Sequence, residues 1–189
     1  MARIYHDEEA DLEVLRSRRI AVIGYGNQGR AQGLNLRDSG LEVIVGSPRD
    51  KSWELAEADG MPVCSVQEAA CQGDVLLLLI PDEVLPEVFR QDIAPGLKDG
   101  DVLDFASGYN IAFKLISPPS YVDVVLVAPR MIGLGVRELY LKGEGFPSFL
   151  GVEQDASGQA LQVALALAKG IGSTKAGAIE VSFAQEAEM

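Results

Sequence analysis

The stretch Arg19-Ile20-Ala21-Val22-Ile23-Gly24-Tyr25-Gly26-Asn27-Gln28-Gly29 decides the fold of this chain. An apolar run leads directly into a glycine-rich turn, and the next residues predict a helix from Gln28 to Ser39 that stops at Gly40. In such a turn the first glycine allows tight bending, the second leaves room for a pyrophosphate, and the third lets the helix pack closely. Free N–H groups and the helix dipole then stabilise the anion. We therefore expect a dinucleotide site made by Gly24 to Gly29, with the pyrophosphate against Tyr25 to Gln28.

Strand-like and helix-like segments alternate along the rest of the sequence. Such alternation predicts parallel strands joined by crossover helices, and strands that are apolar on both faces indicate helices on both sides of the sheet. The expected architecture is an α/β doubly wound, mostly parallel (Rossmann) sheet of about eight strands, with residues 1–189 forming one domain. The predicted strands are Ile20–Gly24, Glu42–Gly46, Met61–Cys64, Val75–Ile80, Val102–Phe105, Val122–Ala128, Ser148–Val152 and Ile179–Phe183. A further helix is expected to open at Ala156-Ser157 and to end at Gly170 or Gly172.

Composition narrows the function classes. The 189 residues are 48% hydrophobic and 23% charged, which suits one globular unit. A net charge of -12 disfavours nucleic acid or an anionic membrane as the partner. The longest apolar run, Val75 to Pro81, is too short to span a bilayer, so we expect a cytoplasmic protein. Cys64 and Cys71 lack metal-ligand or redox spacing and are interpreted as small buried residues.

The end of the second predicted strand bears on cofactor choice. NAD sites usually place Asp or Glu there, roughly 20 residues after the glycine motif, to accept a hydrogen bond from the ribose 2′-hydroxyl. Ser47 occupies that place, and Arg49, Lys51 and Ser52 follow it. Two cations and two hydroxyls suit a 2′-phosphate, which favours NADP(H) over NAD(H). The alternative is an ordinary solvated turn, and Asp50 argues against a phosphate.

Taken in order, many segments resemble the N-terminal domain of ketol-acid reductoisomerase, the acetohydroxyacid isomeroreductase of branched-chain amino-acid synthesis. The resemblance implies an NADP-binding Rossmann domain of an oxidoreductase, and adds Pro81, Asp82 and Gly108 to the expected cofactor contacts. Family members join this domain to a helical C-terminal domain that carries most of the active site. The matching segments include the glycine turn, Leu34–Gly40, Ser52-Trp53, Pro81–Val84, Ile93–Pro95, Gly108–Ile111, Val127–Pro129, Gln154–Gly158 and Ala168–Gly172.

The sequence departs from that family at its chemical positions. Ser107 stands where the family has a histidine, and Arg130-Met131-Ile132-Gly133-Leu134 replaces its Lys-Gly-Pro-Gly-His. Arg130 keeps a charge but cannot give up a proton at neutral pH. The family's magnesium-binding carboxylates would begin beyond Met189, and Glu186 and Glu188 are expected to be exposed, so no metal site is predicted within this chain.

Three functions remain open at this point. The chain can be a reductoisomerase-like component completed by a helical partner domain or chain, or by a homodimer. It can be a non-catalytic paralogue that binds NADP(H) as a sensor or regulatory partner. It can also reduce a small ketoacid alone, using Ser107, Tyr109, Lys114 or Arg130, although a carbonyl reduction needs a proton donor and a neutral serine is a poor one unless a base adjoins it.

Overall fold

The computed structural model describes residues 1–189 and contains nine strands and nine α-helices. The strands are β1 Ile4–Tyr5, β2 Arg19–Ile23, β3 Glu42–Gly46, β4 Val63–Cys64, β5 Val75–Leu78, β6 Val102–Phe105, β7 Asp123–Pro129, β8 Ser148–Gln154 and β9 Ala178–Glu180. The helices are α1 Glu13–Arg16, α2 Asn27–Asp38, α3 Lys51–Ala58, α4 Val66–Gln72, α5 Leu85–Val88, α6 Tyr109–Ala112, α7 Gly133–Lys142, α8 Ala160–Ile171 and α9 Phe183–Ala187. Short 3-10 or π-helical turns lie at Asp7–Glu9, Phe89–Ile93, Ala94–Gly96 and Ser173–Lys175.

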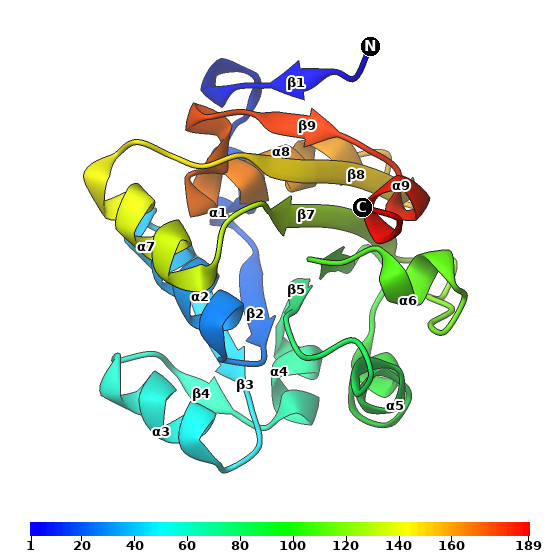
Figure 1. The fold of residues 1–189 in the computed structure, drawn as a ribbon. Coiled ribbons are helices and arrows are strands. Elements are labelled where there is room, and N and C mark those ends of the chain that lie inside the picture. The colour runs from blue at the N-terminus through cyan, green and yellow to red at the C-terminus, as the bar shows by residue number, and fades with distance from the viewer.

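All nine strands form one sheet in the order β1-β9-β8-β7-β6-β5-β2-β3-β4 (Figure 1). The strands β2 to β7 are mutually parallel, as expected from the crossover helices between them. β8 runs antiparallel to β7, β9 is parallel to β8, and β1 is antiparallel to β9. The carboxyl ends of β2, β3, β5, β6 and β7 therefore meet at one edge, where α/β sheets bind ligands.

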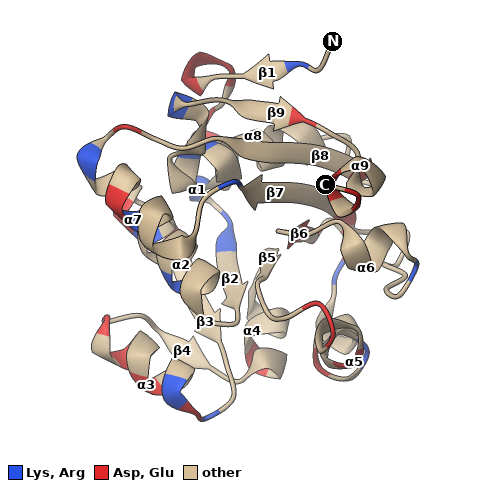
Figure 2. Ribbon diagram, viewed as in Figure 1, with Lys and Arg blue, Asp and Glu red and all other residues tan.

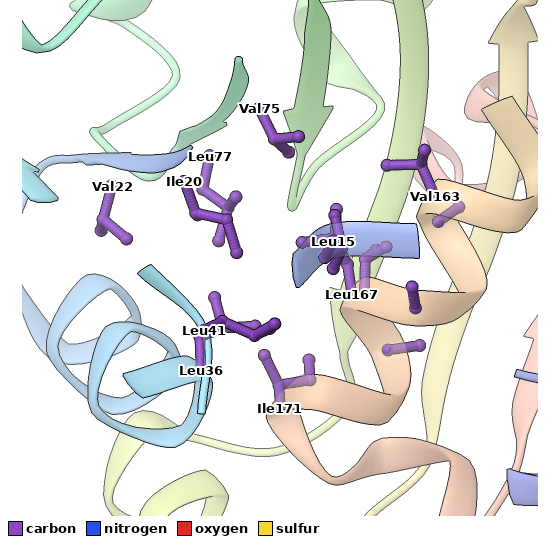
Figure 3. Close-up of a cluster of buried hydrophobic side chains, with 14 of the residues drawn as sticks. Leu15, Ile20, Val22, Leu36, Leu41, Val75, Leu77, Val163, Leu167 and Ile171 are labelled. Atoms are coloured by element: carbon purple, nitrogen blue, oxygen red, sulfur yellow. The ribbon is translucent and has the colours of Figure 1, made fainter. Parts of the chain in front are cut away.

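Helices cover both faces of the sheet, and each face has its own hydrophobic core. Alternate residues of β2 point to opposite cores: Ile20 and Val22 join one, and Ala21 and Ile23 the other. The first core is closed by α1, α2 and α8 (Figure 3). The second is closed by α4, α5 and α9. Burial on both faces explains why β2, β5 and β7 are almost continuously apolar.

The predicted doubly wound, mostly parallel sheet is confirmed, and its errors are local. β3 and β6 have the predicted bounds, and the other predicted strands differ at their ends. The ninth strand, β1, was not expected, because a two-residue edge strand carries no periodicity to detect. The predicted last strand is wrong at its end: Phe183 begins α9, which Ser182 caps through the amide of Gln185.

Two further sequence expectations are wrong. The helix expected at Ala156-Ser157 begins at Ala160, because the backbone amide and hydroxyl of Ser157 donate to the buried carboxylate of Asp123 and hold a turn there. Cys71 is exposed rather than buried, and Cys64 is half-buried. No helix is both long and apolar enough to cross a lipid bilayer.

Candidate dinucleotide site

The three glycines of the turn between β2 and α2 have different physical roles. Gly24 has φ +94°, and a Cβ there would lie 2.6 Å from the backbone oxygen of Leu79. A Cβ on Gly29 would lie 2.1 Å from the backbone oxygen of Gly24. The fold itself therefore needs these two glycines. Gly26 differs, because a Cβ there would meet nothing within 4 Å and its φ of -81° is open to any residue. Of the three glycines in this turn, only Gly26 has open space where a Cβ would be.

That empty space lies against the start of α2. Gly26 is the N-cap of the helix, no side chain caps its first amides, and its first turn contains no acidic residue. First-turn N–H groups have no partner within a helix, so these amides are available to an anion. A cavity of about 510 Å³ opens here, which is within the range typical of small-molecule sites. Its walls come from the glycine turn and from the N-terminal and middle parts of α2, α3 and α7, and include Tyr25, Gly26, Asn27, Lys51 and Ser52.

The turn from β3 into α3 brings basic and hydroxyl groups to the same cavity. Figure 2 shows basic residues where the chain enters α3, and of these Lys51 lines the cavity together with Ser52. The other two predicted contacts of this turn, Ser47 and Arg49, do not line the cavity, and the guanidinium of Arg49 lies 4.4 Å from the ring centre of Trp53. Ser47 is buried, and its hydroxyl donates to the backbone oxygen of Pro48, 2.9 Å away.

Asp50 has a structural task in this turn. Its carboxylate caps α3 by accepting from the backbone amides of Ser52 and Trp53, at 2.9 and 3.4 Å. The helix N-terminus therefore compensates the negative charge of Asp50, the residue that disfavours a phosphate in the sequence.

Behind the glycine turn lies a group of polar side chains centred on Asp59, the C-cap of α3. Its carboxylate accepts from the Tyr25 hydroxyl at 2.9 Å and from Arg30 Nε and Nη2 at 2.8 and 3.0 Å. The hydrogen bond from Arg30 holds the pKa of Asp59 below its usual range. Burial and then the hydrogen bond to Asp59 raise the pKa of Tyr25, so its hydroxyl stays a donor.

Pro81 and Asp82 follow β5, the strand next to β2, and Gly108 follows β6, but none of the three lines this cavity. Asp82, after β5, accepts from the Ser107 hydroxyl at 3.0 Å and from the Asn110 side-chain amide at 3.4 Å. The Ser107 oxygen in turn accepts from the backbone amide of Tyr109 at 3.2 Å. A carboxylate thus adjoins Ser107, but the serine proton is donated to it.

The remaining catalytic candidates are dispersed around α6 and α9. Arg130 Nη1 lies 3.6 Å from a carboxylate oxygen of Glu186, whose other oxygen accepts from the Gly108 amide at 2.6 Å. The expectation that Glu186 is exposed is wrong, since its side chain is only 10% exposed, while Glu188 is exposed. Tyr109 stacks on Phe113 and Lys114 is exposed, and neither hydrogen bond nor ion pair joins Tyr109 to Lys114. No group of three or more His, Cys, Asp or Glu side chains is placed to hold a metal ion.

Most residues of the cavity wall were not predicted from the sequence. The spacing Asn27, Arg30, Ala31 and Leu34 marks one face of α2, which was a readable signal once the helix was predicted. The wall from α7 had no local signal, because it depends on tertiary packing. A Cβ on Gly133 would lie 2.2 Å from the backbone oxygen of Asn27, so α7 meets α2 closely at this glycine. The other residues of the wall are Leu55, Leu134 and Arg137.

A Rossmann-type sheet, a glycine turn with one unfilled position and an uncapped helix start over a cavity define a dinucleotide-binding domain. The profile of the family described as acetohydroxy acid isomeroreductase, NADPH-binding domain, matches residues 14–177. The chain is also 58% identical over 189 residues to a ketol-acid reductoisomerase (NADP(+)) of Pyrobaculum aerophilum and 51% identical to one of Methanopyrus kandleri. The chain therefore belongs to the ketol-acid reductoisomerase family and contains its NADPH-binding domain.

The chain spans 58% of the length of these two relatives, which match all of it. The solved structure of an NADH-preferring ketol-acid reductoisomerase from an uncultured archean superimposes with a TM-score of 0.95 at 46% identity, over 98% of this chain and 58% of that one. The homologues thus carry a second domain. A semialdehyde dehydrogenase NAD-binding protein from Cupriavidus necator, with a TM-score of 0.73 at 18% identity over 89% of this chain and 64% of that one, shares the fold alone.

Proposed function

We propose that the chain binds NADP(H) as the dinucleotide-binding part of a ketol-acid reductoisomerase-like oxidoreductase. The observation that carries the proposal is the empty position at Gly26, where a Cβ would meet nothing within 4 Å beside uncapped helix amides. Packing explains the neighbouring glycines and does not explain this one. A pyrophosphate oxygen needs the space and the N–H groups that this position offers.

The preference for NADP(H) over NAD(H) is a separate part of the proposal. It is supported by Lys51 and Ser52 in the cavity wall and by Arg49 at the same turn. The relatives named NADP(+) enzymes favour it as well. The relative with the NADH preference shows that this property differs within the family, so it has to be measured for this chain.

We further propose that the chain alone does not catalyse isomeroreduction. Alkyl migration in this reaction class needs a Lewis-acid metal, and the side chains here do not fit one, because no cluster of three ligating groups exists. The proton of Ser107 is directed to Asp82, and Arg130 is matched by Glu186. Metal ligands and a proton donor would come from the second domain of the homologues, from a separate helical chain or from a second copy.

A non-catalytic role in sensing NADP(H) is the second candidate. It is favoured by the same observation, since the pyrophosphate position is intact while Ser107 and Arg130 are engaged by carboxylates. The two candidates differ in what a partner does: a component gains turnover when the helical domain is supplied, and a sensor does not.

Calorimetric titration tests the proposal directly. NADPH, NADP and NADH are titrated into the purified chain, each with and without magnesium. We expect NADPH to bind more tightly than NADH, with affinity independent of magnesium. Absence of binding by all three dinucleotides would overturn the proposal. Oxidation of NADPH with a 2-ketoacid would instead establish a reductase that acts alone.

A further inference from the structure

Helix α3 carries Lys51 and Ser52 to the cavity and packs against the core only through Leu55 and Ala56. Of its eight residues only Ala56 is fully buried. The cap supplied by Asp50 and the contact between Arg49 and Trp53 are internal to the segment, so they do not fix α3 to the sheet. Apart from the apolar contact of Leu55 and Ala56, polar contacts at the other end of the helix join it to the glycine turn and to α2.

Those contacts converge on Asp59. Its carboxylate receives three hydrogen bonds from the Tyr25 hydroxyl and the Arg30 guanidinium, all between 2.8 and 3.0 Å. Its backbone oxygen accepts from Arg37 Nη1 at 2.7 Å. The Asp59 side chain is only 15% exposed, which strengthens these charge-assisted bonds relative to surface pairs. All three partners belong to the glycine turn or to α2.

We propose that Asp59 is a positioning residue of the cofactor site, which sets the span between the pyrophosphate position at Gly26 and the phosphate-selective residues Lys51 and Ser52. Tyr25, Gly26, Arg30 and the first residues of α3 all line the same cavity. Loss of the hydrogen bonds of Asp59 lets α3 tilt away from α2. The first turn of α3 then moves away from the position in which Lys51 and Ser52 would contact a 2′-phosphate. Pyrophosphate binding depends on the backbone of β2 and α2 and is retained.

This inference rests on the proposed NADP(H) binding and gives a signature that ordinary destabilisation would not. A purely structural loss weakens NADPH and NADH alike. Loss of positioning weakens NADPH alone, because NADH lacks the 2′-phosphate that Lys51 and Ser52 would contact. The ratio of the two dissociation constants is therefore the informative quantity.

The experiment measures both dissociation constants by calorimetry for the parent, Asp59→Asn, Arg30→Gln, Tyr25→Phe and the Asp59→Asn, Arg30→Gln double variant. Glu42→Gln is the matched control, since it removes an ion pair to Arg19 at the amino ends of the strands, away from the cavity. We expect Asp59→Asn to raise the NADPH constant by about fivefold or more and the NADH constant by less than about twofold. The double variant should be little worse than either single variant, because the two groups act as one unit.

Hydrogen exchange of the α3 amides in the cofactor-free protein supplies a second readout, expected to quicken in Asp59→Asn and not in Glu42→Gln. Equal loss of NADPH and NADH affinity, an unchanged ratio, or tighter NADPH binding by a released Arg30 would each overturn the inference while the proposed function stands. A parent that binds neither dinucleotide overturns both.

Discussion

Two regions at the carboxyl edge of the sheet, the glycine turn after β2 and the surroundings of Ser107 after β6, differ in what holds them. At the glycine turn, the backbone determines the geometry. Gly24 and Gly29 are required by packing, and Gly26 leaves an unfilled position beside helix amides that no side chain caps. Around Ser107, the polar contacts are between side chains: Ser107 donates to Asp82 and Arg130 pairs with Glu186, while the buried side-chain oxygen of Asn110 has no partner. The first region leaves the first amides of α2 without a side-chain partner. The second satisfies its own charges.

This difference separates binding from chemistry. Backbone amides at a helix start bind a phosphate whatever the neighbouring side chains are, so a dinucleotide site can persist when catalytic side chains change. Proton transfer needs a free donor of suitable pKa near the reacting atom. We therefore expect a chain that binds its cofactor but needs a partner for chemistry.

The largest expected effect is the absence of isomeroreductase turnover. The purified parent and Ser107→His should both fail to convert acetolactate with NADPH and magnesium, because an imidazole restores neither metal ligands nor their geometry. The check is NADPH absorbance against a reaction lacking magnesium. Magnesium-dependent turnover by either protein would show that the region around Ser107 is functional as it stands.

The second-largest expected effect is on NADPH affinity, when a side chain fills the open space at Gly26. Gly26→Val should weaken NADPH binding by about a hundredfold or more, since its side chain occupies the pyrophosphate position. A side chain at Gly26 meets nothing within 4 Å, so the variant should fold, with the unfolding temperature lowered only by the less favourable N-cap. Calorimetry and thermal unfolding measure the two properties. Parental NADPH affinity in this variant would place the site elsewhere.

A smaller effect is expected at the turn before α3. Arg49→Ala should narrow the ratio of NADH to NADPH dissociation constants by roughly 10- to 150-fold, the worth of one charge-assisted contact of about 1.5–3 kcal/mol. The same direction is expected for substitutions of Ser47 and Ser52. Arg90→Ala, an exposed arginine after α5, serves as the control. Full retention of the NADPH preference would count against this turn as the selective element.

The smallest expected effect is on the free energy of unfolding and not on dinucleotide affinity. Asp104 is buried in β6, neither carboxyl oxygen has a hydrogen-bond partner, and burial raises its pKa well above the usual value. The carboxyl of Asp104 ionises at a lower pH in the unfolded chain than in the folded protein. As the pH rises from about 4 towards the folded pKa, the free energy of unfolding therefore falls, by up to about 1.4 kcal/mol per pH unit.

Asp104→Asn should remove that slope. Urea unfolding of both proteins between about pH 5.5 and 7.5 measures it, and the difference in favour of the variant should grow with pH. Parallel profiles would mean that Asp104 does not stay neutral in the folded protein. Dinucleotide affinity should be the same in both, since the carboxyl lies within the sheet and does not line the cavity.

Much of the fold could be predicted from the sequence because its signals are local. The apolar runs of β3 and β6 and the glycines that bound α2 fix those elements without tertiary information. The antiparallel β8 could not be distinguished, because strand direction depends on how the chain returns to the sheet. The start of α8 was misplaced because the deciding contact, Asp123 to Ser157, joins residues 34 positions apart.

The candidate site divides in the same way. The backbone of the glycine turn was predicted residue by residue, since its geometry follows from glycine spacing. The links from Tyr25 and Arg30 to Asp59, and from Gly108 to Glu186, were not predicted. They pair side chains and amides from distant segments, and no periodicity encodes such pairs.

Amide chemical shifts in the ¹⁵N-labelled chain, followed during titration with NADPH, test the central claim most directly. If the pyrophosphate binds at the glycine turn, the largest shifts fall on Gly26, Asn27 and Gln28, with smaller shifts at Lys51 and Ser52, and Gly26→Val loses them. Largest shifts around Ser107 and Gly108 with an unmoved glycine turn, or no shifts at saturating NADPH, would contradict it.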